Sequence, residues 1–360
     1  METTLFHLWV YKCYRILMIQ DARVLKEDHV PGEVVERNSE LNALSGALEP
    51  IEEGESAESA FLFGPSGTGK TFLAKFMLGE LEREVLDVNT QFLNCWQDYT
   101  RYRVLYEVLD GFASTVNIHR QSTATDKLLN QVQHYDGPPY VVVLDEVDQL
   151  EDKEVLYDLY KVGNLSMILI SNREKELFTH LDNRLVSRLH GARRIQLQKY
   201  HLNELADILE QRTINGLERD AIDRRQLELI SDLAAGDARI GIAILRSAAR
   251  EAESRGADKI TSEIIKSVAP EARDTVQQKT INQLREHQRV LYEVLDEHGE
   301  LNPGELYCHY QESVDDPKTD RTVRNYLKKM EHYNLLIAEG EKRGRTYRAK
   351  NPDDMSNDFD

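Results

Sequence analysis

The chain has few of the residues that build disulfide frameworks and zinc sites. Its 360 residues include only Cys13, Cys95 and Cys308, never in C-x-x-C spacing, and its eleven histidines form no H-E-x-x-H motif. These absences argue against a disulfide-stapled fold or a zinc site and favour a reducing cytoplasm. No apolar run reaches the roughly 20 residues that span a bilayer, so we expect no membrane partner. The N-terminal stretch has no small-residue cleavage site of a signal peptide, and Met18 is an alternative start.

The chain also lacks an excess of positive charge. Its 45 Lys and Arg residues face 63 Asp and Glu residues, which gives a net charge of −18. Taken alone, this balance argues against a nucleic-acid-binding protein, because phosphate contacts need basic side chains. A strongly acidic surface suits a cytoplasm with high salt, where repulsion is screened, and it equally suits ordinary solubility.

A phosphate-binding loop is the strongest motif in the chain. Residues 64–71 read G-P-S-G-T-G-K-T and lie between an apolar strand at 60–63 and a helical pattern. This is the strand–loop–helix order that the motif requires, and its glycines let backbone N–H groups approach a polyphosphate. Lys70 is predicted to reach the β- and γ-phosphates, and the Thr71 hydroxyl to hold Mg²⁺. The residues assigned to nucleotide here are Gly67, Thr68, Gly69, Lys70 and Thr71.

The sequence predicts a further strand over residues 85–93, and a second motif follows the buried strand at 140–144. This strand, Y-V-V-V-L, is uninterrupted and β-branched, as in the interior of a parallel sheet. It ends in Asp145-Glu146, and an apolar strand ending in Asp-Glu downstream of a phosphate-binding loop is the Walker-B pattern. Asp145 would hold Mg²⁺ through water, and Glu146 would orient or deprotonate the attacking water.

Four further polar residues are candidates for phosphate contacts. Asn172 follows a strand at 165–170, at the sheet edge that faces the ligand crevice, although a simple turn is the alternative. Arg184 and Arg188 lie on one helix face, aimed either at phosphate or at exposed ion-pair partners. Arg239 follows the G-D-A at 236–238 in the first turn of a helix, where the macrodipole disfavours a cation. We therefore expect Arg239 to bind phosphate, with a solvated surface role as the alternative.

The C-terminal segment differs in pattern and in charge. Helical patterns over 280–295, 303–310 and 319–333 precede short strands at 335–338 and 345–348, which is the order of a winged helix. Residues 318–350 hold ten basic and four acidic side chains, so this segment carries +6 and the rest of the chain −24. The alternative to DNA binding is a solvated helix face in a protein-binding module. The predicted DNA contacts are Arg321, Arg324, Lys328, Arg343 and Arg345.

Over residues 23–350 these motifs resemble one family, the archaeal initiators of the origin-recognition and cell-division-cycle type, which are AAA+ ATPases. His29-Val30-Pro31 and the Arg37-Asn38-Ser39-Glu40 helix start resemble that family's approach to the loop. The resemblance implies an α/β P-loop NTPase core, a parallel sheet with helices on both faces, followed by an α-helical lid and a winged helix. The expected segments are an N-terminal extension at 1–22, the core at 23–199, the lid at 200–275, the winged-helix DNA-binding domain at 276–350 and an acidic tail at 351–360.

The resemblance also implies a function. Such proteins bind ATP or ADP with Mg²⁺ between core and lid, hydrolyse slowly as a switch, bind double-stranded origin DNA and help load the replicative helicase. Related initiator paralogues are further expected partners, in a nucleoid-associated cytoplasmic setting. By position, Asn172 is sensor 1, Arg239 is sensor 2, and Arg188 is the arginine finger, with Arg184 as the alternative. Two lid-side contacts to nucleotide match Tyr200 and Arg212.

Two other classes stay open at this stage. A regulatory or signalling ATPase whose winged helix binds protein or regulates transcription would bind nucleotide without affinity for DNA. A clamp-loader-like motor would turn over ATP quickly in a ring and lack a winged helix, which the basic C-terminal hairpin argues against.

Overall fold

The computed structural model describes residues 17–112, 123–174, 183–189, 191–340 and 344–350. These residues form two compact units. The sheet unit consists of Asp28–Ile208 together with Gly236–Ala238, and the C-terminal unit consists of Leu209–Ala235, Arg239–Asp360 and the N-terminal residues up to Glu27, each within its described residues. Among the described residues, no helix has both the length and the apolar character needed to cross a bilayer.

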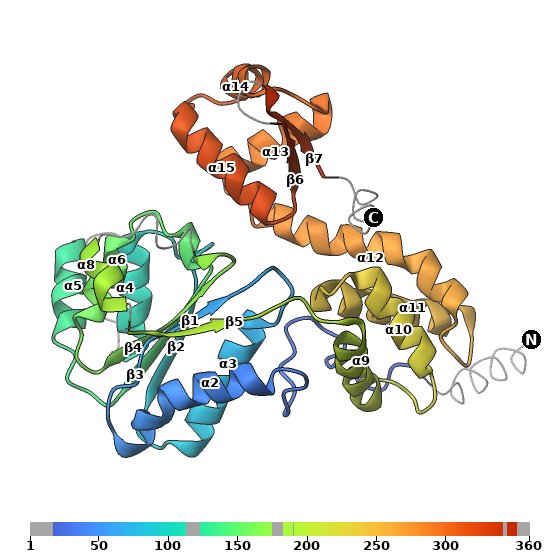
Figure 1. Cartoon of the computed structure of the whole chain (residues 1–360), viewed down its shortest axis with the longest axis horizontal. Coiled ribbons are helices and arrows are strands. Elements are labelled where there is room, and N and C mark those ends of the chain that lie inside the picture. Colours follow the sequence, from blue (N-terminus) through green and yellow to red (C-terminus); the bar gives the residue numbers. More distant parts are fainter. Residues whose placement is uncertain (1–16, 113–122, 175–182, 190, 341–343, 351–360) are drawn as a thin grey trace, which may run out of the picture. The chain divides into compact units, whose positions relative to one another are not determined.

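The sheet unit is built on a five-stranded sheet in the order β2-β3-β4-β1-β5, and all of its pairings are parallel (Figure 1). The register places Phe63 opposite both Ser171 and Gln196, and Asn94 opposite Asp145. The carboxyl ends of the strands therefore meet at one edge, where a parallel sheet receives its ligand. The strands are β1 (Ala60–Phe63), β2 (Asn89–Asn94), β3 (Tyr140–Asp145), β4 (Leu165–Ser171) and β5 (Arg193–Gln196).

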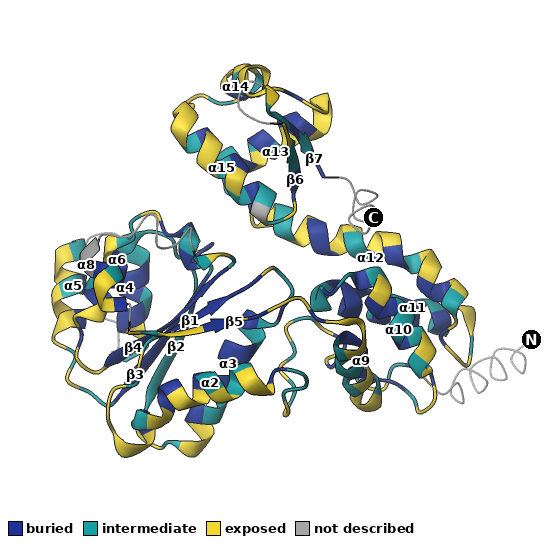
Figure 2. Cartoon of the chain, viewed as in Figure 1, coloured by how far each residue is buried: buried dark blue, intermediate teal, exposed yellow. Residues whose placement is uncertain are grey.

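Alternate residues of each strand face opposite layers of the unit. On β1, Phe61 and Phe63 join a core covered by α4, α5, α6 and α8, while Ala60 and Leu62 join a core covered by α2 and α3. Figure 2 shows β1, β3 and β4 buried between the two helical layers, which confirms the predicted fold class of the core. The helices are α2 (Asn38–Leu48), η1 (Glu49–Glu53), α3 (Lys70–Glu84), α4 (Arg101–Asp110), α5 (Thr125–Gln133), η3 (Val147–Gln149), α6 (Glu154–Tyr160) and α8 (Asn183–Leu189).

One predicted strand is shorter than its apolar pattern indicates. The sequence favours a strand over residues 85–93, but β2 begins only at Asn89. Val85 ends α3 as its C-cap residue, and its N–H still donates to the carbonyl of Leu81. The chain then bends at Leu86, whose side chain is fully exposed, so apolar character alone does not make this stretch a strand.

The lid segment of the chain is helical. Helix α9 begins in the sheet unit and ends in the C-terminal unit, and the helix pattern predicted from residue 201 onward is confirmed. Helix α11 buries an almost continuous apolar run from Ile240 to Leu245. The N-terminal residues pack in the same unit, where Ile19 forms an antiparallel bridge with Leu217. The helices are α9 (Leu202–Gly216), α10 (Arg224–Ala234), α11 (Ala238–Arg255) and α12 (Ser262–Asn282).

Three helices and an antiparallel hairpin complete the C-terminal unit, in the order predicted for a winged helix. Leu301 adds a bridge to Tyr347 through reciprocal backbone hydrogen bonds of 2.9 and 2.8 Å. Buried residues such as Leu306 and Leu327 form the core of these elements. The elements are α13 (Glu286–His298), α14 (Pro303–Glu312), α15 (Asp320–His332), β6 (Leu336–Glu339) and β7 (Thr346–Ala349).

The prediction of one helix over residues 280–295 is wrong. Helix α12 ends at Asn282 and α13 begins at Glu286. The break has a local cause: Arg285 adopts an extended backbone and its N–H donates to Oε1 of Gln288 at 3.2 Å, while Leu284 is buried between the two helices. The domain boundary expected at 275/276 falls within the continuous helix α12 and stays a prediction.

Candidate nucleotide site

The phosphate-binding loop requires glycine at the positions where the backbone is most constrained. Gly67 and Gly69 have φ angles of +75° and +92°, in the left-handed region that favours glycine. At Gly64 the reason is space, because a Cβ atom there would lie 2.1 Å from the carbonyl oxygen of Leu197, just after β5. The Thr68 hydroxyl donates to the Pro65 carbonyl at 3.0 Å and closes the turn. The residues of the motif therefore account for the backbone conformation of the loop.

Lys70 directly follows Gly69 and is the first residue of helix α3. Its side chain is buried, and Nζ donates to the carbonyls of Gly64 at 2.6 Å and Pro65 at 2.8 Å. Nζ also donates to Oδ1 of Asn172 at 3.0 Å, which joins the loop to the end of β4. The ammonium is thus held by oxygen atoms of the kind that a phosphate would supply.

Thr71 and Asp145 meet at the predicted Mg²⁺ position. The Thr71 hydroxyl donates to Oδ2 of Asp145 at 2.8 Å, and Asp145 is only 4 % exposed. Burial raises the pKa of the Asp145 carboxyl, while the Thr71 hydrogen bond and the Lys70 charge oppose that rise. Oδ1 of Asp145 is buried and has no hydrogen-bond partner among the described residues.

These donors fit a magnesium ion. Mg²⁺ prefers oxygen ligands and is typically bound by one or two carboxylates plus phosphate and water. The described residues contain no group of three or more His, Cys, Asp or Glu that would hold a metal by itself. The hydroxyl of Thr71 and the unpartnered oxygen of Asp145 therefore suit an ion that also binds the nucleotide, rather than an all-protein metal centre.

Glu146 and Asn172 flank this position. Glu146 has a φ of +56°, a left-handed conformation that is costly for a non-glycine residue and that recurs at functional sites. Asn172 bonds Lys70 through Oδ1, while its Nδ2 is buried without a hydrogen-bond partner among the described residues. The structure thus brings Lys70 to Asn172 and Thr71 to Asp145 through two separate hydrogen bonds. Their catalytic and binding roles stay predictions.

The remaining predicted residues are placed less directly. Arg188 is exposed on α8, with its guanidinium carbon 5.0 Å from the ring centroid of Tyr157, while the side chain of Arg184 lies outside the described residues. Arg212 is buried in the C-terminal unit, where it donates to the carbonyls of Val24 at 2.6 Å and Lys26 at 3.1 Å. These hydrogen bonds give Arg212 a structural role in addition to its predicted contact with nucleotide.

Tyr200 and Arg239 are the remaining predicted contacts to nucleotide. The Tyr200 hydroxyl lies 2.6 Å from where a Cβ atom on Gly69 would stand, so Tyr200 packs against the loop. Arg239 is the second residue of α11, as the sequence predicts, and belongs to the C-terminal unit. Its predicted phosphate contact stays a prediction.

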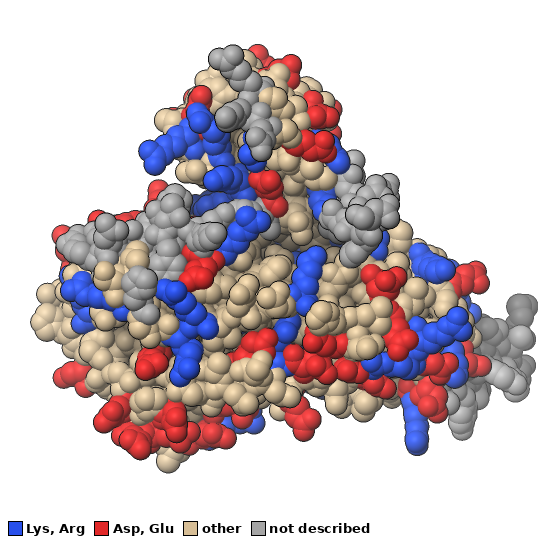
Figure 3. Space-filling view, viewed as in Figure 1, with Lys and Arg blue, Asp and Glu red and all other residues tan. Residues whose placement is uncertain are grey.

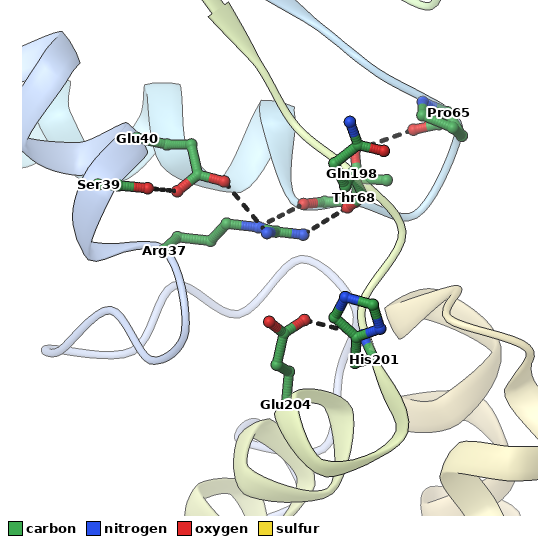
Figure 4. Close-up of polar contacts among 8 residues, drawn as sticks. All are labelled: Arg37, Ser39, Glu40, Pro65, Thr68, Gln198, His201 and Glu204. Atoms are coloured by element: carbon green, nitrogen blue, oxygen red, sulfur yellow. Dashed lines mark hydrogen bonds and ion pairs between the residues drawn. The ribbon is translucent and has the colours of Figure 1, made fainter.

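Sequence reasoning missed two residues that contact the loop from outside the motif. Arg37 donates from Nε to the Thr68 carbonyl at 3.3 Å, as Figure 4 shows. Asp237 packs against Gly67, since a Cβ atom there would lie 1.9 Å from its Oδ1. The sequence marks these two residues only by their place in short motifs, the Arg-Glu helix start and the G-D-A-R run, and neither motif by itself predicts a contact with the loop.

The predicted DNA contacts of α15 lie on one exposed face. Arg321, Arg324 and Lys328 are exposed, while Val323 and Leu327 on the opposite face are buried. Figure 3 shows Lys and Arg side chains gathered over α15.

The hairpin contributes less than the sequence indicates. Arg345 is only about one-third exposed, and its Nη2 lies 3.2 Å from Oε2 of Glu331. Arg343 lies outside the described residues. The DNA-contact roles assigned to both arginines stay predictions.

Comparison with known proteins adds an independent finding. Residues 53–181 match the family model of an AAA domain, and residues 206–269 match that of a Cdc6 AAA+ ATPase-type lid domain. The chain is 49% identical over 330 residues to ORC1-type DNA replication protein 9 of Halobacterium salinarum, covering 92% of this chain and 93% of that protein. It is 50% identical over 308 residues to ORC1-type DNA replication protein 1 of the same organism, covering 86% of this chain and 100% of that protein.

Solved structures are similar over the same extent. The ORC1 protein of Aeropyrum pernix, in complex with DNA, superimposes with a TM-score of 0.72 at 25% identity, covering 92% of this chain and 94% of that one. The ORC2 protein of Aeropyrum pernix, in ADPNP–ADP complexes, has a TM-score of 0.63 at 23% identity, covering 93% and 94% of the two chains. The second likeness supports the fold alone.

Proposed function

Because the chain belongs to the family of ORC1-type DNA replication proteins, we propose that it is a nucleotide-switched initiator that binds double-stranded origin DNA. The AAA+ ATPase fold implies nucleotide binding. The observation that carries the proposal is the pair of hydrogen bonds at the sheet edge, in which Lys70 contacts Asn172 and Thr71 contacts Asp145. The alternative of a regulatory or signalling ATPase is not favoured, since relatives that match 92% of the chain are replication proteins.

The proposed ligand is ATP or ADP with Mg²⁺. The loop amides from Gly67 to Thr71 would bind the phosphates, and the Lys70 ammonium would exchange its loop carbonyls for phosphate oxygens. When bound, Mg²⁺ neutralises charge on the β- and γ-phosphates. Thr71 and Asp145 are the residues that would hold it, since their oxygens already face each other.

The proposed hydrolysis is slow and serves as a switch. Glu146 would orient or deprotonate water, and the unpartnered Nδ2 of Asn172 would donate to the γ-phosphate or to that water. Arg188 is proposed as a finger that acts on nucleotide of a neighbouring subunit, because it is exposed and its guanidinium rests on an aromatic ring. Tyr200, Arg212 and Arg239 are the proposed contacts from the lid side.

The proposed DNA contacts are Arg321, Arg324 and Lys328 on α15, with Arg343 and Arg345 of the hairpin. Exposed basic side chains on one helix face supply the phosphate contacts on which DNA affinity depends. The replicative helicase and related initiator paralogues are proposed partners, in a nucleoid-associated cytoplasmic location. These partners follow from family membership and not from a surface of this chain.

Replacing Lys70 by alanine tests the nucleotide site. We expect Lys70→Ala to abolish ADP and ATP binding in titration calorimetry, because the loop then lacks its only ammonium. Arg83→Ala is the control, since Arg83 is exposed in the last turn of the same helix α3 and should leave affinity unchanged. Circular dichroism checks that both variants fold. Wild-type affinity in folded Lys70→Ala would refute the site assignment.

A further inference from the structure

A buried arginine outside the sequence motif contacts the phosphate-binding loop. Arg37 precedes α2 and is only 5 % exposed, although it carries a charge. Its guanidinium makes three polar contacts, drawn in Figure 4: Nε donates to the Thr68 carbonyl at 3.3 Å, Nη2 donates to the Gln198 carbonyl at 2.6 Å, and Nη1 lies 3.1 Å from Oε1 of Glu40. A buried charge is tolerated only when it is paired in this way.

The flat face of the same guanidinium rests on an aromatic ring. Its central carbon lies 3.9 Å from the ring centroid of Tyr200, a cation–π contact in a desolvated place. The hydroxyl of Tyr200 in turn packs against Gly69. Arg37 and Tyr200 therefore bear on two consecutive residues of the loop, Thr68 and Gly69, through contacts that lysine cannot reproduce together.

Because the peptide bond is planar, the hydrogen bond from Arg37 to the Thr68 carbonyl also orients the N–H of Gly69. The Thr68 carbonyl and the Gly69 N–H belong to one planar trans peptide, so the two groups point in opposite directions. A hydrogen bond that holds the carbonyl toward Arg37 turns the N–H away from Arg37. The preceding peptide is held in the same manner, because the Gly67 carbonyl accepts from the N–H of Ala238 at 3.0 Å. A carbonyl that accepts from a cation also makes the N–H of its peptide a stronger donor.

We propose that Arg37 is a positioning residue of the phosphate-binding loop. It fixes the Thr68–Gly69 peptide with its N–H available to phosphate, and it ties that peptide to the Gln198–Tyr200 segment, which leads into α9. Arg37 itself touches no phosphate in this scheme and acts through Thr68, Gly69 and Tyr200. The inference rests on the proposed nucleotide function and adds a residue to it.

The test is ADP affinity in Arg37→Lys, measured by titration calorimetry on the full chain. Lysine keeps the charge but cannot bond both carbonyls while stacking flat on Tyr200. We expect ADP to bind about tenfold or more weakly, as for the loss of a hydrogen bond to a charged group. Arg101→Lys is the control, because Arg101 on α4 pairs with the buried Asp158 at 2.7 Å in the same unit, and it should lower stability without changing ADP affinity.

Two further measurements separate positioning from a merely structural role. The amide proton resonance of Gly69 should move upfield in nucleotide-free Arg37→Lys, because its peptide carbonyl loses a charged donor. Glu40→Gln, which keeps the shape of the Arg37 partner, should weaken ADP binding by a smaller factor in the same direction. If Arg37→Lys does not fold, the ADP affinity of Glu40→Gln tests the positioning role of Arg37.

The outcomes distinguish this inference from the proposed function. A wild-type chain that binds no ADP contradicts the proposed function itself. A wild-type chain that binds ADP, with unchanged affinity in folded Arg37→Lys or, failing that, in Glu40→Gln, overturns the positioning role alone. An unshifted Gly69 resonance in Arg37→Lys overturns the peptide mechanism.

Discussion

The carboxyl group of Asp145 illustrates how single residues set the chemistry of this site. It is almost completely buried and has one oxygen bonded to Thr71 and one oxygen without a hydrogen-bond partner among the described residues. Burial of an unsatisfied carboxylate oxygen is costly in the absence of a ligand. A nearby cation would offset both that cost and the raised pKa of this carboxyl, which supports the proposal that Asp145 helps to hold a metal bound with nucleotide.

Asp145→Asn should separate nucleotide binding from magnesium. We expect the wild-type chain to bind ATP more tightly with Mg²⁺ than with EDTA, and the variant to lose most of that difference, about tenfold, as for outer ligands of a metal. The measurement is calorimetric titration with a slowly hydrolysed ATP analogue in both buffers. Asp158→Asn, at another buried aspartate, is the control. If Asp145→Asn kept the full magnesium effect, the metal assignment would have to move elsewhere.

At the level of elements, the loop and helix α3 use glycine for different reasons. Gly67 has a φ of +75° and faces the Asp237 carboxylate, so a side chain there meets both backbone strain and a neighbour. Gly79 lies within α3, and a Cβ atom there would meet nothing within 4 Å apart from its own helix backbone. The same residue type is therefore required in the loop and dispensable in the helix.

The same substitution at these two positions should change stability in opposite directions. Gly67→Ala should lower the free energy of unfolding by about 1–2 kcal/mol from its left-handed backbone, with an added cost from Asp237. Gly79→Ala should raise it by roughly 0.5–1 kcal/mol, because alanine loses less conformational freedom in a helix. Urea unfolding without nucleotide measures both. Equal shifts, or a destabilised Gly79→Ala, would contradict this account of the two glycines.

Across the whole molecule, charge is distributed unevenly, and this distribution resolves an apparent conflict. A net charge of −18 argues against DNA binding, yet the segment 318–350 carries +6. Helix α15 exposes Arg321, Arg324 and Lys328 on the face opposite its buried residues. Because screening limits charge effects to about 10 Å at moderate salt, a local basic surface can bind phosphate although the chain as a whole is acidic.

Salt dependence of DNA binding tests this surface. Each phosphate contact contributes roughly 0.9 to the slope of log affinity against log salt for B-form DNA. Arg324→Glu should therefore weaken binding to duplex DNA and flatten that slope by about one unit, measured by fluorescence anisotropy at several salt concentrations. Arg250→Glu is the matched control, since Arg250 is an exposed arginine on α11 and does not belong to the segment 318–350. Equal slopes in both variants and the wild type would remove α15 from the DNA interface.

Local sequence was sufficient for much of this protein. Glycine at 64, 67 and 69 and the apolar runs of β1, β3 and β4 encode short-range geometry and burial, so the loop, the strands and their order along the chain follow from residue type and spacing. The closeness of Lys70 to Asn172 and of Thr71 to Asp145 follows as well, because parallel strands bring their carboxyl ends to one edge. The helix break at Leu284 was missed, since a continuous apolar pattern does not reveal that the Arg285 N–H is bonded by the Gln288 side chain at the start of a new helix.

Contacts between distant parts of the chain needed the folded molecule. Arg37 bonds carbonyls 31 and 161 residues further along the chain, at Thr68 and Gln198, and no spacing rule links such positions. The sequence predicts a nucleotide contact for Arg212, and the fold adds hydrogen bonds from its guanidinium to backbone carbonyls near the N-terminus. An arginine can bond any carbonyl that packing brings within reach, so its residue type fixes what it can donate, and the fold chooses the acceptor.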